Sequence, residues 1–184
     1  PRFDAARSLE LIERYTITHS QWVPTMFVRL LRLPESARKA YDLSSHRYAI
    51  HAAAPCPISV KEAMLDWWGP ILYEYYSGTE GNGQTAISPE DWQRHKGSVG
   101  RSILGQVRIT DSQGRVLPPG QTGAVYFEGG PRFEYFKDPE KTAAAYNEQG
   151  WSTLGDIGHQ DEDGYLYLTD RASHMIITGG VNVY

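Results

Sequence analysis

The run Tyr-Tyr-Ser-Gly-Thr-Glu-Gly at residues 75–81 contains residue types that suit a nucleotide. Gly78 lets the backbone approach a phosphate closely, and the Thr79 hydroxyl can donate a hydrogen bond to it. The Glu80 carboxylate is the kind of hard oxygen ligand that Mg²⁺ requires, and the ring of Tyr76 can cover the face of a purine. The run therefore predicts a purine nucleotide site with Mg²⁺, although an ordinary turn after a strand accounts for the same residues.

A carboxylate and a guanidinium later in the sequence suit a ribose. Asp156, in the run Gly-Asp-Ile-Gly at residues 155–158, can accept hydrogen bonds from both ribose hydroxyls. Arg171 carries a permanent charge on a forked group, which suits ribose or phosphate oxygens. The acidic run at residues 161–164 faintly resembles a calcium loop, but it lacks the other ligands and the bidentate glutamate, so we interpret it as a hairpin turn.

Two further stretches leave a structural and a functional interpretation open. The three alanines at residues 52–54, followed by Pro55, either leave space for a flat group against bare backbone or let a helix pack on a sheet. His51, just before them, is most simply a core histidine. The paired glycines at residues 179–180 permit the torsions of a hinge or of a tight turn.

The first half of the chain is predicted to be a layered α/β structure that positions these residues. Apolar spacing predicts helices at residues 5–15 and from Pro24, and the capping-box pattern of Ser59 and Glu62 predicts a third helix, which ends at Gly69. Extended segments are predicted at residues 17–23, 48–53 and 71–76. This alternation is typical of a parallel sheet layered with helices, and open α/β sheets bind ligands at the carboxyl ends of their strands.

The second half predicts short strands separated by glycine- and proline-rich turns. The predicted strands are residues 107–109, 124–127 and 165–168, with turns at residues 111–114, 118–120 and 161–164. Such a pattern predicts a small antiparallel β-sheet or a distorted barrel. We therefore assign an α/β sub-domain to residues 1–95, a β-rich sub-domain to residues 96–173 and the start of a further domain to residues 174–184.

Composition excludes several classes of function. A net charge of -4 with scattered basic residues argues against a nucleic-acid partner. The single cysteine, Cys56, excludes an internal disulfide and a cysteine-rich zinc site, and without an activating partner nearby in sequence we interpret it as a small semi-buried residue rather than a nucleophile. No charged-then-apolar leader and no long apolar run occur, so we expect no signal peptide, no membrane span and a soluble cytoplasmic protein.

Taken together, these stretches resemble the adenylate-forming superfamily. The resemblance rests on Tyr-Ser-Gly-Thr-Glu at residues 76–80, Asp-Pro-Glu-Lys-Thr at residues 138–142, and Gly-Asp and Asp-Arg within residues 151–184. The superfamily contains acyl-CoA synthetases, 4-coumarate-CoA ligases, firefly luciferase and nonribosomal-peptide adenylation domains. The similarity covers essentially the whole chain, and the tail at residues 175–184 is most similar to bacterial fatty-acyl or aryl-CoA ligases.

The resemblance implies a two-step reaction. A carboxylate attacks the α-phosphate of ATP to give an acyl-adenylate and pyrophosphate, and the thiol of CoA then displaces AMP to give a thioester. It also implies that Tyr76 stacks on adenine, that Thr79 contacts the phosphate, that Glu80 holds Mg²⁺, and that Asp156 binds the ribose beside Arg171. Thr79 and Glu80 are the implied catalytic residues. The nucleotide-binding residues that the resemblance implies are Ala53, Ala54, Pro55, Tyr75, Tyr76, Ser77, Gly78, Thr79, Asp156, Leu168 and Arg171.

The implied acyl pocket and hinge lie elsewhere in the sequence. Trp22, Val23, His51 and Gly83 are the pocket candidates by position, and Ser173 occupies the position of the inter-domain hinge. Some positions depart from the family pattern. Ser77 and one of the alanines at residues 52–53 stand where the family commonly has glycine, and Ser173 stands where it commonly has Asp or Lys.

Two parts of the family pattern are absent from the chain. The Ser/Thr/Gly-rich phosphate loop is expected before residue 1, and the C-terminal domain with its lysine is expected after Ser173. We therefore expect a fragment of an ATP-dependent enzyme that activates a fatty or aryl acid, with the fragment itself inactive. An adenylation domain that loads a carrier protein and a non-catalytic nucleotide-binding module remain alternatives, and the sequence does not predict the oligomeric state.

Overall fold

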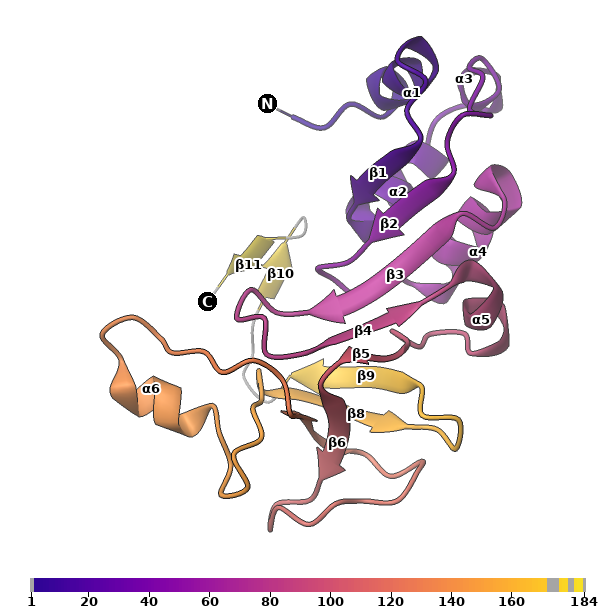
Figure 1. The fold of residues 1–184 in the computed structure, drawn as a ribbon. Helices are drawn as coiled ribbons and strands as arrows, with labels where there is room; N and C mark the ends of the chain where they lie inside the picture. The colour runs from indigo at the N-terminus through magenta and orange to yellow at the C-terminus, as the bar shows by residue number, and fades with distance from the viewer. Residues whose placement is uncertain (1, 172–175, 179–180, 184) are drawn as a thin grey trace. The chain divides into compact units, whose positions relative to one another are not determined.

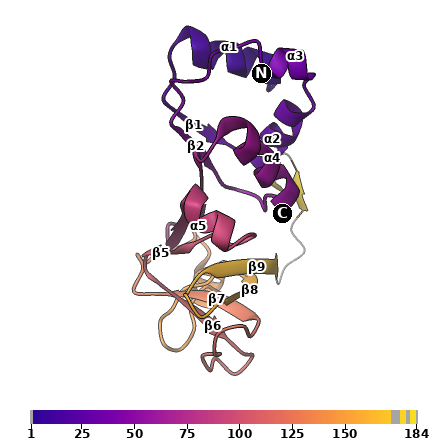
Figure 2. The same ribbon diagram turned by 90° about the vertical axis from the view of Figure 1, so that its right-hand side faces the viewer.

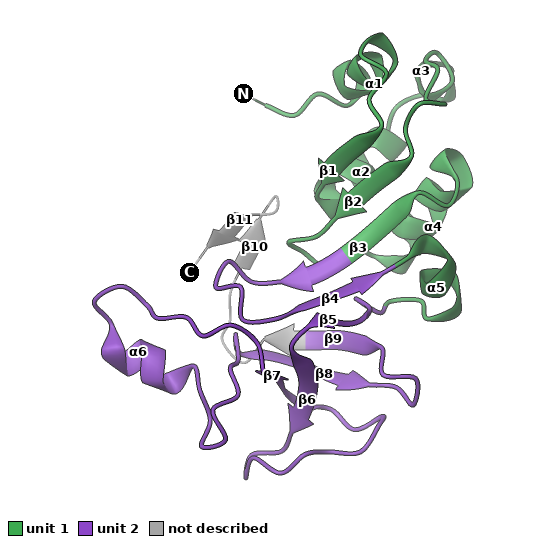
Figure 3. Cartoon of the chain, viewed as in Figure 1, with its two compact units in different colours: residues 1–74, 88–97, 177–184 green, residues 75–87, 98–176 purple. Residues whose placement is uncertain are grey.

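The chain folds into two compact units. The computed structural model describes residues 2–171, 176–178 and 181–183, with side chains for residues 2–169. Unit 1 contains residues 1–74, 88–97 and 177–184, and unit 2 contains residues 75–87 and 98–176 (Figure 3). The division places the run at residues 75–81 in the same unit as Asp156.

Unit 1 is a parallel sheet layered with helices. Its strands are β1 (His19–Trp22), β2 (Tyr48–His51) and the first part of β3 (Leu72–Ser77), and its helices are α1 (Ala5–Arg14), α2 (Pro24–Leu31), α3 (Glu35–Arg38), α4 (Ile58–Trp68) and α5 (Pro89–Arg94). β2 runs parallel to both β1 and β3. Helices α2 and α4 pack side by side on one face of these strands (Figures 1 and 2). The predicted α/β class is confirmed.

The helices of unit 1 begin where local chemistry favours them. The Asp4 side chain accepts a hydrogen bond of 2.9 Å from the backbone N–H of Arg7, which caps α1. Pro24 stands at the first turn of α2, where its missing N–H costs nothing. Phe27 and Leu30 on α2 are fully buried, so packing against the sheet stabilises this short helix.

The start of α4 differs from the prediction. The capping box of Ser59 and Glu62 was wrong, because the helix begins at Ile58 after Pro57 and no side chain caps it. Glu62 instead pairs with Lys96 at 2.5 Å. The end of the helix is as predicted, since Gly69 is its C-cap residue and has a φ of +79°.

Unit 2 is built on an open antiparallel sheet. Its strands are β6 (Gln106–Thr110), β7 (Gly123–Glu128), β8 (Asp156–Gln160) and β9 (Leu166–Arg171), hydrogen-bonded in that order. Each pairing is antiparallel, with an irregularity between Ile157 and Gly158. Among the described residues these strands form a sheet and not a closed barrel, which decides between the two predicted forms. The core of the sheet is Val107, Ile109, Val125, Phe127 and Leu166.

Further elements of unit 2 lie before and between these strands. The end of β3 from Tyr75 belongs to this unit, and β4 (Gln84–Ile87) pairs antiparallel with β5 (Arg101–Leu104). Helix α6 (Pro139–Ala144) begins at an Asp138 cap, whose side chain accepts from the backbone N–H of Lys141 at 2.9 Å.

The end of the chain contributes a small two-stranded sheet of β10 (Ile176–Thr178) and β11 (Val181–Val183). The predicted hinge Ser173 and the glycines at residues 179–180 lie outside the described residues. No helix in the described part of the chain is long and apolar enough to cross a membrane.

Candidate functional site

The loop that follows β3 forms a tight turn in unit 2. Gly81 has φ at +66°, and its N–H donates to the carbonyl of Gly78 at 3.1 Å. The Ser77 hydroxyl donates to the carbonyl of Gly83 at 2.8 Å and closes the base of the loop. Serine therefore has a structural task at the position where the resemblance implies glycine.

A side chain at Gly78 would displace two neighbouring side chains. A Cβ at this position would lie 2.4 Å from Leu154 Cδ1 and 2.7 Å from Glu80 Oε2, and both distances are shorter than real contacts. Glycine therefore allows the loop to lie against the Leu154 side chain and allows the Glu80 carboxylate to fold back over its backbone. The neighbouring Thr79 is exposed.

One oxygen of the Glu80 carboxylate is hydrogen-bonded within the protein. Its Oε1 accepts a hydrogen bond of 2.9 Å from the Tyr135 hydroxyl. No group of three or more His, Cys, Asp or Glu side chains that could hold a metal occurs in the part of the chain that the structure describes. A single carboxylate still fits Mg²⁺, because this ion is usually bound by one or two carboxylates together with waters and substrate phosphates.

Asp156 and Tyr76 are in direct contact. The Tyr76 hydroxyl donates to Asp156 Oδ2 at 2.5 Å, and Asp156, the first residue of β8, is only 3% exposed. The Tyr76 ring stacks on Phe127 with the ring centroids 6.1 Å apart and the planes 27° apart. An aromatic ring and a carboxylate, far apart in sequence, thus lie together at one end of the sheet of unit 2.

The remaining nucleotide candidates of unit 2 lie close by in the strand register. Arg171 of β9 stands opposite Asp156 of β8, although its side chain lies outside the described part. Leu168 of β9 packs against the core of the sheet. Tyr75, the first residue of this unit, is partly buried on β3.

The sequence did not predict the hydrogen-bonded polar residues next to the loop that follows β3. Asn82 is fully buried, and its side-chain amide donates to Ser152 Oγ at 3.0 Å. The Thr153 hydroxyl donates to the carbonyl of Val125 at 2.7 Å and accepts from the N–H of Gly155 at 3.0 Å. The only sequence signal for these residues is that Asn82 directly follows the predicted loop.

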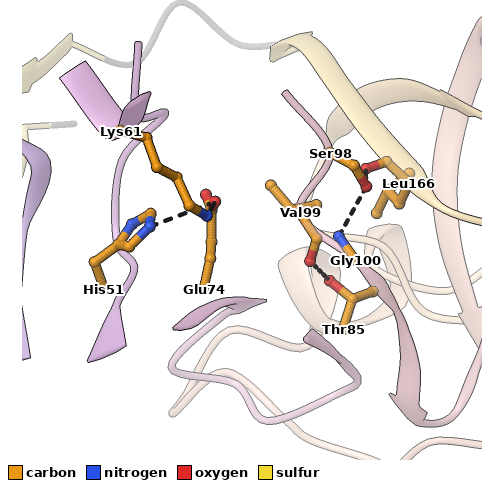
Figure 4. A network of polar contacts seen from close by, with 8 residues as sticks. All are labelled: His51, Lys61, Glu74, Thr85, Ser98, Val99, Gly100 and Leu166. Carbon is orange, nitrogen blue, oxygen red and sulfur yellow. Dashed lines mark hydrogen bonds and ion pairs between the residues drawn. The ribbon is translucent and has the colours of Figure 1, made fainter. Parts of the chain in front are cut away.

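A second network in unit 2 joins β4, residues 98–100 and β9 (Figure 4). The Ser98 hydroxyl donates to the carbonyl of Leu166 at 2.8 Å and accepts from the N–H of Gly100 at 2.9 Å. The Thr85 hydroxyl donates to the carbonyl of Val99 at 2.6 Å. These bonds satisfy buried groups where the chain returns from unit 1 to unit 2.

The pocket candidate of unit 2, Gly83, has a packing reason to be glycine. A Cβ there would lie 2.1 Å from Cδ1 of the Phe127 ring. The ring that supports Tyr76 therefore occupies the space beside Gly83. Its role in an acyl pocket stays a prediction.

Unit 1 carries three other predicted nucleotide-binding residues. Ala53 follows β2 with φ at +73°, a left-handed torsion that is uncommon for alanine, and its side chain is exposed. Ala54 is partly buried and Pro55 is exposed. These residues belong to unit 1 and the Tyr76–Asp156 pair to unit 2, so their contact with one nucleotide stays a prediction.

The pocket candidates of unit 1 are largely core residues. His51 is fully buried and Trp22 is 5% exposed, while Val23 precedes the first turn of α2. Burial, and to a lesser degree the charge of Lys61, lowers the pKa of His51 well below its usual value, so the ring is neutral. This geometry agrees with the simpler interpretation of His51 as a core histidine, and a pocket role stays a prediction.

A buried ion pair in unit 1 was missed altogether. Lys61 Nζ donates to Glu74 Oε2 at 2.6 Å, and His51 Nε2 lies 3.5 Å from the same oxygen (Figure 4). The ammonium also lies 4.8 Å from the centroid of the Trp92 ring. Burial raises the pKa of Glu74 and lowers that of Lys61, and each charge opposes the shift of the other. The network links α4 to the last residue of β2, just before the alanines, and to the middle of β3, just before Tyr75.

Comparisons with known proteins place these features in a family context. A family model described as AMP-binding enzyme matches residues 1–132. The chain is 31% identical to a long-chain-fatty-acid–CoA ligase of Bacillus subtilis (strain 168) over 188 residues, which covers 100% of this chain and 33% of that protein. The chain thus spans about a third of the length of the curated relatives it matches.

Solved structures with the same fold include two ligases. The amide bond synthetase McbA from Marinactinospora thermotolerans is 35% identical with a TM-score of 0.89, and the match covers 100% of this chain and 37% of that chain. The o-succinylbenzoate CoA synthetase of Bacillus subtilis, in complex with its acyl-adenylate intermediate, is 30% identical with a TM-score of 0.78, and the match again covers 100% and 37%.

Proposed function

The chain belongs to the AMP-binding enzyme family, and on that premise we propose that the full-length protein is an ATP-dependent acyl-CoA synthetase. In the first step a carboxylate oxygen of the acid attacks the α-phosphorus of ATP, and the bond to pyrophosphate breaks. In the second step the CoA thiol loses its proton and attacks the acyl carbonyl carbon, and AMP leaves. The acid is a fatty or an aryl acid.

The contact between Tyr76 and Asp156 is the observation that carries this proposal. Asp156 Oδ2 accepts a hydrogen bond from the Tyr76 hydroxyl, and this contact supports the proposal because it brings the proposed ribose ligand beside the proposed adenine-stacking ring. In the proposed complex it accepts from the ribose hydroxyls, with Arg171 beside it. Tyr76, supported from behind by Phe127, covers the adenine face.

The loop after β3 binds the phosphates in this proposal. Gly78 brings the backbone close to them, the exposed Thr79 donates its hydroxyl, and Glu80 holds Mg²⁺. The metal supplies positive charge that stabilises the charge developing on the α-phosphate. Thr79 and Glu80 are accordingly the proposed catalytic residues.

Further roles are proposed from the resemblance. Ala53, Ala54, Pro55, Tyr75, Ser77 and Leu168 are further candidates for contacts with the nucleotide. Trp22, Val23, His51 and Gly83 are candidates for the acyl pocket, and Ser173 for the hinge. Because the chain spans about a third of its relatives, we propose that the 184-residue piece alone does not complete the reaction.

The molecule that accepts the acyl group in the second step is the least constrained part of the proposal. CoA is favoured because the curated relatives with full coverage of this chain include a long-chain-fatty-acid–CoA ligase and an indoleacetate–CoA ligase. One solved structure with this fold is named an amide bond synthetase, and an amide is a different product from a thioester. The first step, formation of an acyl-adenylate, is therefore the part to test first.

The test is a pyrophosphate-release assay on the full-length protein. It contains ATP, Mg²⁺ and a panel of fatty and aryl acids, with and without CoA. We expect acid-dependent pyrophosphate release, and with CoA a matching amount of acyl-CoA and AMP. Binding of AMP without pyrophosphate release for any acid would instead indicate a non-catalytic nucleotide-binding module. Release of pyrophosphate without acyl-CoA would indicate another acceptor, such as a carrier protein.

A further inference from the structure

Tyr135 contacts the proposed metal ligand from 55 positions away in the sequence, and the proposed function gives it no role. Resting on that function, we propose that Tyr135 is a positioning residue that fixes Glu80 as a one-oxygen ligand of Mg²⁺. The Tyr135 hydroxyl donates to Glu80 Oε1 at 2.9 Å, so one carboxylate oxygen is already engaged within the protein.

The two oxygens of Glu80 have different surroundings. Oε1 carries the phenol hydrogen bond, whereas Oε2 lies over the backbone of Gly78, only 2.7 Å from where a Cβ would stand. A metal bound by both oxygens would compete with the phenol for Oε1. The arrangement therefore favours a single bond through Oε2, which suits the strict octahedral shell of Mg²⁺ better than the larger, more adaptable shell of Ca²⁺.

Helix α6 and the segment before it hold Tyr135 in place. The Tyr135 backbone N–H donates to Thr142 Oγ1 at 2.9 Å, and that hydroxyl donates in turn to the carbonyl of Asp138 at 2.8 Å. Lys141 Nζ lies 4.1 Å from the centroid of the Tyr135 ring. A cation over the ring draws electron density from it and strengthens the phenol as a hydrogen-bond donor.

The same segment offers a matched control. The Tyr146 hydroxyl accepts from the backbone N–H of Phe133 at 2.7 Å and lies 2.9 Å from its carbonyl. These bonds tie the segment together without any contact to Glu80. Tyr146→Phe therefore removes a phenol hydroxyl from the same part of unit 2 and tests for a merely structural effect.

The experiment measures binding of ATP to the full-length protein by calorimetry in Mg²⁺ and in Ca²⁺. For Tyr135→Phe we expect ATP affinity in Mg²⁺ to fall about tenfold, because a hydrogen bond to a charged group is lost. Affinity in Ca²⁺ should change less, since the released Glu80 can bind the larger ion with both oxygens. Tyr146→Phe should lower the melting temperature and leave the Mg²⁺/Ca²⁺ ratio of affinities unchanged.

An unchanged Mg²⁺/Ca²⁺ ratio in folded Tyr135→Phe would overturn the inference. Should that variant not fold, Thr142→Val, which removes the acceptor of the Tyr135 N–H, should lower the ratio in the same direction, and an unchanged ratio would equally overturn it. In a Glu80→Gln background, Tyr135→Phe should have no further effect on the ratio. A wild-type protein whose ATP binding does not depend on a divalent ion would contradict the metal role of Glu80 in the proposed function and with it this inference, whereas an unchanged ratio in a variant with metal-dependent ATP binding would contradict the inference alone.

Discussion

Asp156 and Tyr76 depend on one another for their orientation. A carboxylate that is 3% exposed must find hydrogen-bond donors, and the Tyr76 hydroxyl is one of them at 2.5 Å. The same contact fixes the edge of the Tyr76 ring, while Phe127 supports its face. A substitution at either residue is therefore expected to change both the ribose contact and the adenine contact of the proposed site.

Ala53 is the residue at which backbone strain can be measured. Its φ of +73° places the Cβ close to its own backbone, and its side chain is exposed, so glycine removes the strain without opening a cavity. We expect Ala53→Gly to leave the free energy of unfolding unchanged or raise it by up to about 1 kcal/mol. The relief of backbone strain in the folded chain offsets the greater conformational freedom of glycine in the unfolded chain. Urea denaturation of the full-length protein measures it. Ala40→Gly, at a position without a positive φ, should destabilise, and equal losses for both variants would contradict the strain.

The sequence predicted some residues of the candidate site from their chemical type. Other residues could be identified only from their contacts in the structure. The chemistry of Glu80 and Asp156 is visible in the sequence, and their meeting in one place was an expectation from the family resemblance. Tyr135 and Lys61 gave no signal, because their partners lie 55 and 13 positions away and belong to other elements. Such contacts follow from the tertiary packing of the segments and not from local spacing.

The Lys61–Glu74 pair joins α4 to β3 and explains why local signals failed there. No role was assigned to Lys61 from the sequence, although it is fully buried and donates to Glu74. Helix α4 thus takes its register from a long-range ion pair and from Pro57, and the pattern of Ser59 and Glu62 does not decide its start. The pair also fixes the strand that leads into the loop of the proposed nucleotide site.

Breaking this pair should destabilise the fold strongly. Lys61→Met leaves the Glu74 carboxylate buried without its cation, and we expect a loss of about 3 kcal/mol in the free energy of unfolding. Lys96→Met breaks the exposed pair with Glu62, whose lysine side chain is 51% exposed, and should cost less than about 1 kcal/mol. Denaturant titration compares the two variants, and equal losses would show that the buried pair has no special weight.

A histidine between β1 and β2 should make unit 1 sensitive to acid. His46 is buried, its Nε2 lies 2.5 Å from Ser20 Oγ on β1, and burial, with a smaller effect of the His19 charge, lowers its pKa from 6.5 to about 4. Between these two values the unfolded chain binds a proton that the folded chain does not. Stability should therefore fall as the pH falls from 6.5 towards about 4.

His46→Gln isolates this contribution from those of the other titrating groups. The variant should lose part of the decline in unfolding free energy over that pH interval, whatever its stability at neutral pH. Denaturation series from neutral pH to pH values near 4 provide the comparison. The same pH dependence in variant and wild type would show that His46 titrates alike in the folded and unfolded chains.

For the whole molecule, the sequence predicted that an α/β part precedes a β-rich part. It did not predict which segments make up each compact unit. The alternation of strands and helices predicted the parallel strands of unit 1, and short strands separated by glycine- and proline-rich turns predicted the antiparallel strands of unit 2. The chain crosses from unit 1 to unit 2 between residues 97 and 98, and residues 75–87 also cluster with unit 2, while the sub-domain boundary at residues 95–96 stays a prediction. Hydrophobic periodicity cannot reveal that a single strand, β3, passes from one unit to the other.

The measurement that tests the account most directly is calorimetric titration of AMP into the full-length protein and its Asp156→Ala variant. Loss of the ribose hydrogen bonds to a charged group should weaken AMP binding by about tenfold or more. Asp66→Ala, which removes an exposed carboxylate on α4, should bind AMP as the wild type does. Equal AMP affinity in the wild type and Asp156→Ala would contradict the assignment of Asp156 to the ribose and with it the proposed nucleotide site.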